Sequence, residues 1–253
     1  MKIKAFASRN IKELMRDPLS YIFCIGFPLV MLLIMTVIGQ NIPKEAGLDI
    51  FNVSNQSAGT AVFGLAFIML FAALLISKDR ESALLSRLFA SPMRAMDFIF
   101  GYALPLTVVA VAQLAVNFVS TIIIAAVIGE NISVFNLLLS LLIHIPSVVF
   151  FIGLGIIFGS TFSANAAPGL CSIIISVAPI LGGVWMDIDS MGGAFLTAAK
   201  IFPFYHAVKA SRSVISGLAD GVLQSVFIIA LWSVAVFVVS VFVFKSKMRS
   251  EKN

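Results

Sequence analysis

Four polar side chains lie at helical spacing in the otherwise apolar run 101–128. They fall at i, i+4, i+7 and i+8 of one helix face: Gln113, Asn117, Ser120 and Thr121. The run 168–186 has a comparable face: Ser172, Ser176, Pro179 and Gly183. Because an amide buried in lipid without a partner is costly, the first face is expected to point inward. These residues either join helices by hydrogen bonds or line the path of a polar substrate.

Few ionisable groups interrupt the apolar runs. None of the 12 acidic residues falls in the apolar core of a run, and no Lys or Arg does, which leaves only His144. Ion-coupled transporters usually place ionisable groups in the membrane, so this scarcity argues against a coupling ion. His144 is either a hydrogen-bonded packing residue or a proton relay. Outside the runs, Asp187 and Asp189 form either a solvated turn or a contact for a cation.

No motif for catalysis, metal binding or nucleotide binding accompanies these groups. Neither histidine has a plausible Ser, Asp or Cys partner nearby in sequence, and the two cysteines lack a zinc-ligand spacing. The stretch GLGIIFGST lacks the lysine and the spacing of a phosphate-binding loop; its Gly155 and Gly159 form a GxxxG pattern that allows close helix packing. We therefore expect no enzyme activity, metal or cofactor in this chain. If ATP drives the protein, another chain binds it.

The composition places these residues in a membrane. Of 253 residues, 60% are apolar and 11% are charged, whereas soluble domains are roughly half apolar and a quarter charged. This excludes secreted, disordered, fibrous and nucleic-acid-binding proteins. A helical span needs roughly 20 mostly apolar residues, and six runs meet this requirement: 19–39, 58–76, 101–128, 137–162, 168–186 and 222–244. We predict an all-α integral membrane protein with a single transmembrane domain over residues 1–253.

The basic residues predict the orientation. With the N-terminus inside, 13 of the 17 Lys and Arg residues fall on inner segments and 4 on outer ones. By the positive-inside rule, both termini are therefore cytoplasmic. The net charge of +5 then faces anionic lipid and needs no soluble acidic partner. The expected location is the plasma or inner membrane of the cell.

Two inner segments are amphipathic. Residues 1–17 place Phe6, Ile11 and Leu14 on one face of a helix that would lie in the interface, and Asp17-Pro18 predicts a break after it. The segment 77–100, SKDRESALLSRLFASPMRAMDFIF, carries seven charges in 24 residues and is too long for a simple turn. Its apolar patch predicts a short helix that Pro92 ends: Leu84, Leu85, Leu88 and Phe89. This helix either docks a cytoplasmic partner or packs beneath its own bundle.

The outer segment 187–221 is too apolar for a solvated loop and too interrupted for a span. Gly192-Gly193 and Pro203 break it. We expect one or two short helices lying in, or dipping into, the outer leaflet. The aromatic residues Phe202, Phe204 and Tyr205 would anchor them at headgroup level.

This layout resembles the ABC-2 type permeases, the membrane subunits of ATP-binding-cassette exporters. The resemblance is strongest at 79–93, DRESALLSRLFASPM, which is similar to the family's acidic-basic cluster, Leu-rich turn and small-x-Pro ending. The matching residues are Glu81, Leu84, Leu85, Arg87, Leu88 and Pro92. Ser82-Ala83 stand where Gly-Thr is usual. The stretch PFYHAVKASRSVISG is similar to the region before the family's last span, so the resemblance covers essentially the whole chain.

The resemblance implies partners and roles. Two copies, or two related permeases, would pair with two ATPase subunits that bind ATP and Mg. The helix in 77–100 would be the coupling helix: Glu81 and Arg87 would make polar contacts with the ATPase, and Leu84 and Leu88 an apolar anchor. The outer segment would be a re-entrant element that helps to close the exit. The short outer loops favour a small amphipathic substrate, such as a drug or antibiotic.

Two other classes of protein fit the same composition. A stand-alone secondary transporter or channel would work without an ATPase, driven by an ion gradient. A non-transporting immunity or scaffold protein would bind a partner but carry no flux. The absence of carboxylates from the apolar runs counts against the first class.

Overall fold

The computed structural model describes residues 2–43, 49–82, 84–85 and 93–250. This part of the chain is helical and contains no strand. In chain order its helices are α1 (Lys2–Arg16), α2 (Pro18–Tyr21), the π-helix η1 (Ile22–Gly26), α3 (Phe27–Gln40), the 3-10 turn η3 (Asp49–Phe51), α4 (Val53–Glu81), α6 (Ala95–Ile128), α7 (Val134–Ile143), α8 (Ile145–Thr161), α9 (Ala167–Leu181), α10 (Ile188–Met191), α11 (Gly193–Ala199), α12 (Pro203–Ile215) and α13 (Val222–Ser250).

Among the described residues, five helical segments are long and apolar enough to cross a membrane. They are Pro18–Gln40, Val53–Glu81, Ala95–Ile128, Val134–Thr161 and Val222–Lys247. The prediction of a helical, multi-pass membrane protein is therefore confirmed. The predicted span 168–186 corresponds to α9, which has only 15 residues, because the chain turns at Gly182 and Gly183, the latter at φ +67°. The count of six spans stays a prediction.

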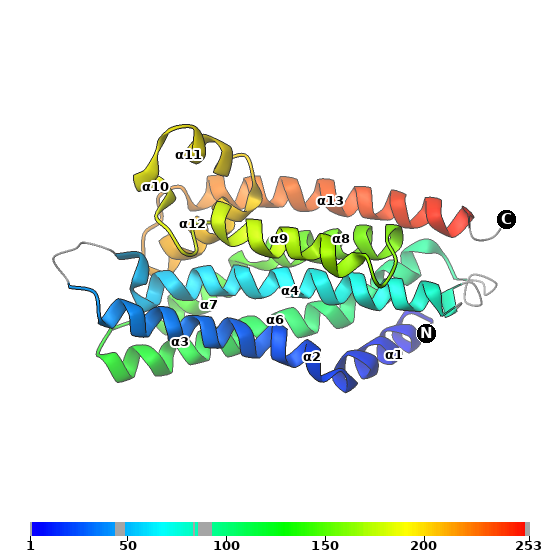
Figure 1. Cartoon of the computed structure of the whole chain (residues 1–253), viewed down its shortest axis with the longest axis horizontal. Coiled ribbons are helices and arrows are strands. Elements are labelled where there is room, and N and C mark those ends of the chain that lie inside the picture. The colour runs from blue at the N-terminus through cyan, green and yellow to red at the C-terminus, as the bar shows by residue number, and fades with distance from the viewer. Residues whose placement is uncertain (1, 44–48, 83, 86–92, 251–253) are drawn as a thin grey trace.

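Helix α4 forms the centre of the bundle (Figure 1). In its apolar window 89% of the residues are buried, compared with 22% in Pro18–Gln40 and 17% in Val222–Lys247. Helix α3 lies along one side of α4, and α8 and α9 lie along the other. The outer helices expose large apolar side chains such as Val37, Val127 and Phe227, and lipid can cover these surfaces.

Helices α4 and α8 pack closely because α8 presents two glycines to its neighbour. A Cβ added at Gly155 would lie 2.6 Å from the carbonyl oxygen of Met69, and one at Gly159 would lie 2.6 Å from that of Ala73. Such distances leave no room for a side chain. The close packing predicted from the GxxxG pattern is confirmed.

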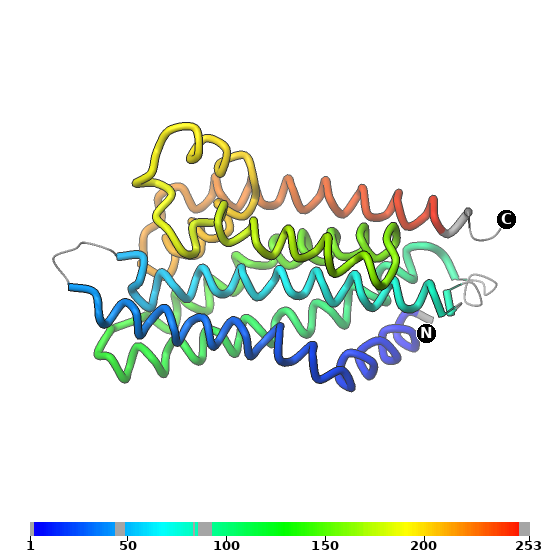
Figure 2. Tube along the Cα trace, viewed as in Figure 1, coloured from blue at the N-terminus to red at the C-terminus, as the bar shows by residue number. Residues whose placement is uncertain are grey.

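Helix α1 and the end of α13 lie at the same end of the bundle, which we call the terminal end (Figure 2). The predicted break at Asp17-Pro18 is confirmed: α1 ends at Arg16, and the Asp17 carboxylate caps α2 by accepting a hydrogen bond from the Leu19 amide at 3.2 Å. The chain changes direction there, so that α1 runs at an angle to α3 (Figure 1).

The opposite end carries the short helices α10, α11 and α12 (Figure 1). There are three of them where one or two were expected. The expectation that Phe204 and Tyr205 anchor these helices at headgroup level is wrong, since both side chains are 4% exposed and lie inside the protein. Phe204 packs on Phe150 and Phe151 at ring-centroid distances of 5.8 and 5.9 Å, because α12 folds back onto the bundle. Phe202 remains exposed.

Candidate functional site

The terminal end of α4 carries a buried carboxylate that joins three helices. Helix α4 continues one turn beyond the predicted span and brings Asp79 among neighbouring helices. The Asp79 carboxylate accepts hydrogen bonds from both terminal nitrogens of Arg9 on α1, with Nη2 at 2.7 Å from Oδ1. It also accepts a hydrogen bond at 2.8 Å from the hydroxyl of Tyr102 on α6. We call Asp79, Arg9, Tyr102 and Asn10 the Asp79 cluster.

The charges of this cluster are matched. Arg9 also pairs with Glu13 one turn further along α1, at 2.9 Å between Nη2 and Oε2. Burial alone would lower the pKa of the Arg9 guanidinium, but the hydrogen bond and the negative charge of Asp79, followed by the charge of Glu13, raise it above its ordinary value. Arg9 therefore stays charged, and the forked geometry of a guanidinium facing a carboxylate fixes the angle between the helices.

Asn10 and Phe6 seat α1 on α6. The Asn10 amide nitrogen donates to the carbonyl oxygen of Gly101 at 3.0 Å, and its amide oxygen accepts from Arg9 at 2.9 Å. The Phe6 ring lies against Gly101, where an added Cβ would come within 2.3 Å of the ring. The same ring packs edge-on against the Tyr102 ring, with 4.9 Å between the ring centroids. The amphipathic pattern of residues 1–17 is thus used to pack against the bundle itself.

The last two residues of α4 bind the turn between α8 and α9. Arg80 donates hydrogen bonds to the carbonyl oxygens of Ser160 and Phe162, the latter at 2.8 Å. The Glu81 carboxylate accepts one from the Ala164 amide at 2.8 Å. Together with the Asp79 cluster, these contacts tie the end of α4 to α1, to α6 and to the α8–α9 turn. The remainder of the amphipathic segment 77–100 begins at the next residue, Ser82.

The predicted coupling residues lie partly in the described structure. Glu81 ends α4, Leu84 is half-buried and Leu85 is 2% exposed within the main apolar core. Leu85 therefore helps to attach this segment to its own bundle. The predictions for Arg87, Leu88, Phe89 and Pro92 concern positions outside the described residues, so the coupling helix stays a prediction.

The polar face of α6 packs against α4. Asn117 donates to the carbonyl oxygen of Ser57 at 3.0 Å and accepts from the Thr60 hydroxyl at 3.0 Å. Thr121 donates to the Ser57 hydroxyl at 2.7 Å. Gln113 is 1% exposed and fills the space beside Gly64, yet neither of its amide atoms has a hydrogen-bond partner among the described residues. Asn117 and Thr121 therefore join helices, whereas Gln113 is a buried path candidate without such a bond in the described part of the chain.

The other predicted path residues are less buried than Gln113 and Asn117. Ser120 is half-buried, and Ser172 and Ser176 lie on the exposed side of α9. The Ser172 hydroxyl bonds within its own helix, to the carbonyl oxygen of Gly169 at 2.7 Å. A path lined by residues from both α6 and α9 stays a prediction.

Replacing Asn117 by alanine tests its structural role. We expect the free energy of unfolding to fall by about 1–2 kcal/mol, because two bonds to α4 are lost and the space that the amide filled is emptied. Ser172→Ala is the control and should change it by less than about 0.5 kcal/mol. Unfolding in mild detergent, followed by helical circular dichroism, measures both values. An unchanged stability for Asn117→Ala would contradict the interpretation.

At the opposite end, polar groups fasten the short helices. Arg212 of α12 donates to the carbonyl oxygens of Gly183 at 2.7 Å and Asn55 at 3.3 Å, and burial lowers the pKa of its guanidinium to about 10. Asp187 caps α10 through the Asp189 amide at 3.1 Å, and Asp189 accepts from the Tyr205 hydroxyl at 2.6 Å. These carboxylates thus serve as caps and acceptors within the fold.

Sequence reasoning missed the Asp79 cluster. The predicted span stopped at residue 76, so Asp79 was assigned to a loop, whereas it is buried within the helix. One signal was available: Asn10 stands between Phe6 and Leu14 at i+4 spacing, on the apolar face of α1. A polar residue on such a face requires a partner in the surface beneath it.

The helices and the polar contacts between them define a class, the multi-pass helical membrane proteins. Comparison with known protein families matches residues 1–216 to the ABC-2 type transporters, and the chain belongs to that family. Members of the family are membrane components of transporters that typically work with a separate ATPase. A search among curated proteins found no match for this chain.

Proposed function

We propose that the chain is the permease subunit of an ABC exporter. Two copies, or this chain and a related permease, would form a transmembrane path for a small amphipathic substrate such as a drug or antibiotic. Two ATPase subunits would bind ATP and Mg on the side of both termini, which the positive-inside rule assigns to the cytoplasm of a plasma or inner membrane. The polar residues of α9, Ser172 and Ser176, would then face the second permease.

The attachment of the end of α4 supports this proposal most. The predicted coupling segment after Ser82 follows directly on a helix end that is fixed to α1, to α6 and to the α8–α9 turn by hydrogen bonds and ion pairs. A force applied to this segment would therefore move several helices together. An ATPase seated on Leu84, Arg87 and Leu88 would apply such a force when it closes on ATP. A segment whose flanking helix lacked such bonds would move without the rest of the bundle.

The test is co-purification with a candidate ATPase partner. The chain is extracted in mild detergent with a tag at its C-terminus, and Leu88→Asp is compared with the unchanged protein. We expect Leu88→Asp to weaken the complex at least tenfold, because a carboxylate on the apolar anchor must be desolvated in the interface.

Leu218→Asp is the matched control. Leu218 is 60% exposed and belongs to the connection between α12 and α13. This connection lies at the end of the bundle away from the termini (Figure 1). This variant should keep the complex, and both variants should keep the helical signal of the unchanged chain. Equal retention of the ATPase by Leu88→Asp and by the unchanged chain would overturn the assigned docking site.

One observation favours a second candidate, an ion-coupled transporter that works alone. His144 is fully buried, and neither ring nitrogen has a hydrogen-bond partner among the described residues. Its ring stacks on Phe118 at a ring-centroid distance of 6.2 Å, which fits a packing residue, but the hydrogen bond expected of such a residue is missing from the described part of the chain. His144→Phe should leave transport by an ABC permease largely intact and abolish transport by a proton-relay protein, so flux measured in vesicles separates the two.

A further inference from the structure

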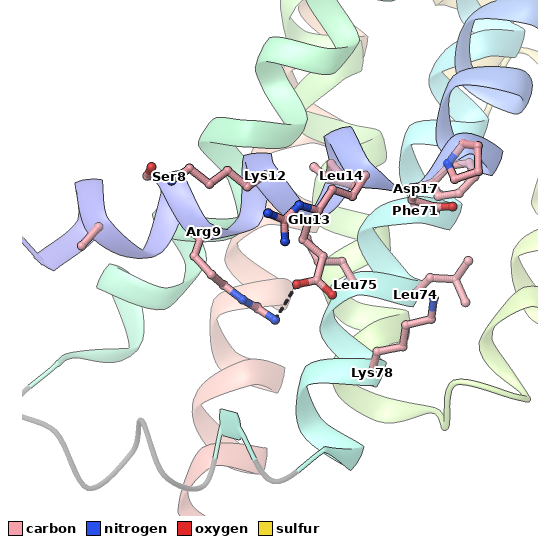
Figure 3. Close-up of a pocket in the computed structure, with 13 residues that line it drawn as sticks. Ser8, Arg9, Lys12, Glu13, Leu14, Asp17, Phe71, Leu74, Leu75 and Lys78 are labelled. Carbon is pink, nitrogen blue, oxygen red and sulfur yellow. Dashed lines mark ion pairs between the residues drawn. The ribbon is translucent and has the colours of Figure 1, made fainter.

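A cavity of about 730 Å³ lies between α1 and the terminal half of α4 (Figure 3). This volume falls in the range of about 300–1,000 Å³ typical of small-molecule sites. One part of its wall is apolar and comes from Leu14 on α1 and from Phe71 and Leu75 on α4. The remainder is polar and strongly charged. The cavity therefore has two chemically different parts.

The cavity wall carries more positive than negative charge, with Arg9, Lys12, Arg16 and Lys78 against Glu13 and Asp17. Its two acidic residues are occupied: Glu13 pairs with Arg9 at 2.9 Å, and Asp17 accepts from the Leu19 amide at 3.2 Å and from the Ser20 hydroxyl at 3.0 Å. Three cations of the wall make no ion pair or hydrogen bond within the described part of the chain: Lys12, Arg16 and Lys78. The cavity thus offers three unpaired positive charges from two helices.

The cavity continues into the surface that faces lipid. Pro18 lines it, and the next residues along the chain expose their apolar side chains, Leu19 by 54% and Ile22 by 56%. A ligand that fits must therefore carry negative charge at one end and a hydrocarbon chain at the other. Lipids of the membrane have this chemistry, and they are present where the cavity opens.

We propose that this cavity binds an anionic phospholipid, with its phosphate at the cationic part of the wall, which carries Lys12, Arg16 and Lys78, and an acyl chain against the apolar wall. The site lies beside the Asp79 cluster, because Arg9 takes part in both. A bound lipid would therefore fasten α1 to α4 next to the ion pair that joins them. The proposal requires only a membrane and stands whether or not an ATPase drives the protein.

Native mass spectrometry of the full chain in detergent tests the proposal, with dioleoylphosphatidylglycerol and dioleoylphosphatidylcholine as the two probes. We expect a preference for phosphatidylglycerol, and we expect Lys12→Gln with Lys78→Gln to weaken its binding by about fivefold for each charge removed. Both side chains are exposed, so the substitutions should leave the fold intact, as a thermal melt will check.

The matched control removes the same charge elsewhere at the same end. Lys245→Gln with Lys247→Gln changes two exposed residues of α13 that do not line the cavity, and it should leave binding unchanged. Equal weakening by both pairs would reduce the effect to overall charge and overturn the site. Equal binding of the two lipids would also overturn it. So would displacement of phosphatidylglycerol by glycerol 3-phosphate, which would identify a site for a soluble phosphate.

Discussion

Replacing Asp79 by alanine is expected to lower the free energy of unfolding by about 2–4 kcal/mol. The Asp79 side chain is 3% exposed and accepts hydrogen bonds from Arg9 and Tyr102, so its removal takes the buried carboxylate away from the Arg9 guanidinium and leaves the Tyr102 hydroxyl without this acceptor. The penalty is placed below that of a fully buried pair because the Arg9 side chain is 35% exposed. Chemical unfolding in mild detergent measures the change.

The second partner of Arg9 supplies the control for this variant. Glu13 is 48% exposed and pairs with Arg9 one helical turn away. Exposed pairs contribute little, so Glu13→Gln should cost less than about 1 kcal/mol. Arg9→Ala combined with Asp79→Ala should cost less than the sum of the two single changes, by about 1–3 kcal/mol. Additive losses would show that the two side chains do not stabilise one another.

Replacing Gly159 by alanine is expected to lower the free energy of unfolding by about 1–3 kcal/mol. The added Cβ would meet the carbonyl oxygen of Ala73 at 2.6 Å and the Cβ of Ile76 at 2.8 Å. A backbone oxygen of the central helix has little freedom to move, so α8 must shift away from α4. The same unfolding experiment in detergent measures this loss.

Gly169→Ala makes the same chemical change where space is open. Gly169 lies in α9, and nothing lies within 4 Å of an added Cβ. Alanine should be neutral there or stabilise by about 0.4–1 kcal/mol, since it reduces the freedom of the unfolded chain and favours helix. Gly159→Ala is therefore expected to lower the free energy of unfolding, whereas Gly169→Ala should leave it unchanged or raise it. Equal effects would contradict the close approach of α8 to α4.

The helical membrane fold could be predicted because long apolar runs have few other solutions in a bilayer. The break at Asp17-Pro18 and the close packing at Gly155 and Gly159 could also be predicted, since each depends on local chemistry. The length of α9 could not, because its apolar run extends to Met186, whereas the chain turns at Gly182 and Gly183. Apolar content measures compatibility with lipid and does not locate a turn.

The candidate site was harder to predict, because its contacts join residues far apart in sequence. Arg9 and Asp79 are separated by 70 positions, and no local pattern reports that they meet. The inward direction of the Gln113–Asn117 face could be predicted from the cost of burying amides in lipid. To decide whether an amide joins helices or lines a substrate path, its hydrogen-bond partner must be known. The structure supplies one for Asn117 on α4 and none among the described residues for Gln113.

The central claim is that a separate ATPase acts on this chain through the segment after α4. The most direct test places a photo-crosslinking amino acid at position 88 and, in a second sample, at position 218, and irradiates membranes that contain both proteins. We expect a cross-linked product of permease and ATPase from position 88 and none from position 218. A chain that is folded and inserted, yet gives no ATPase product from position 88 or gives equal products from both positions, would contradict it.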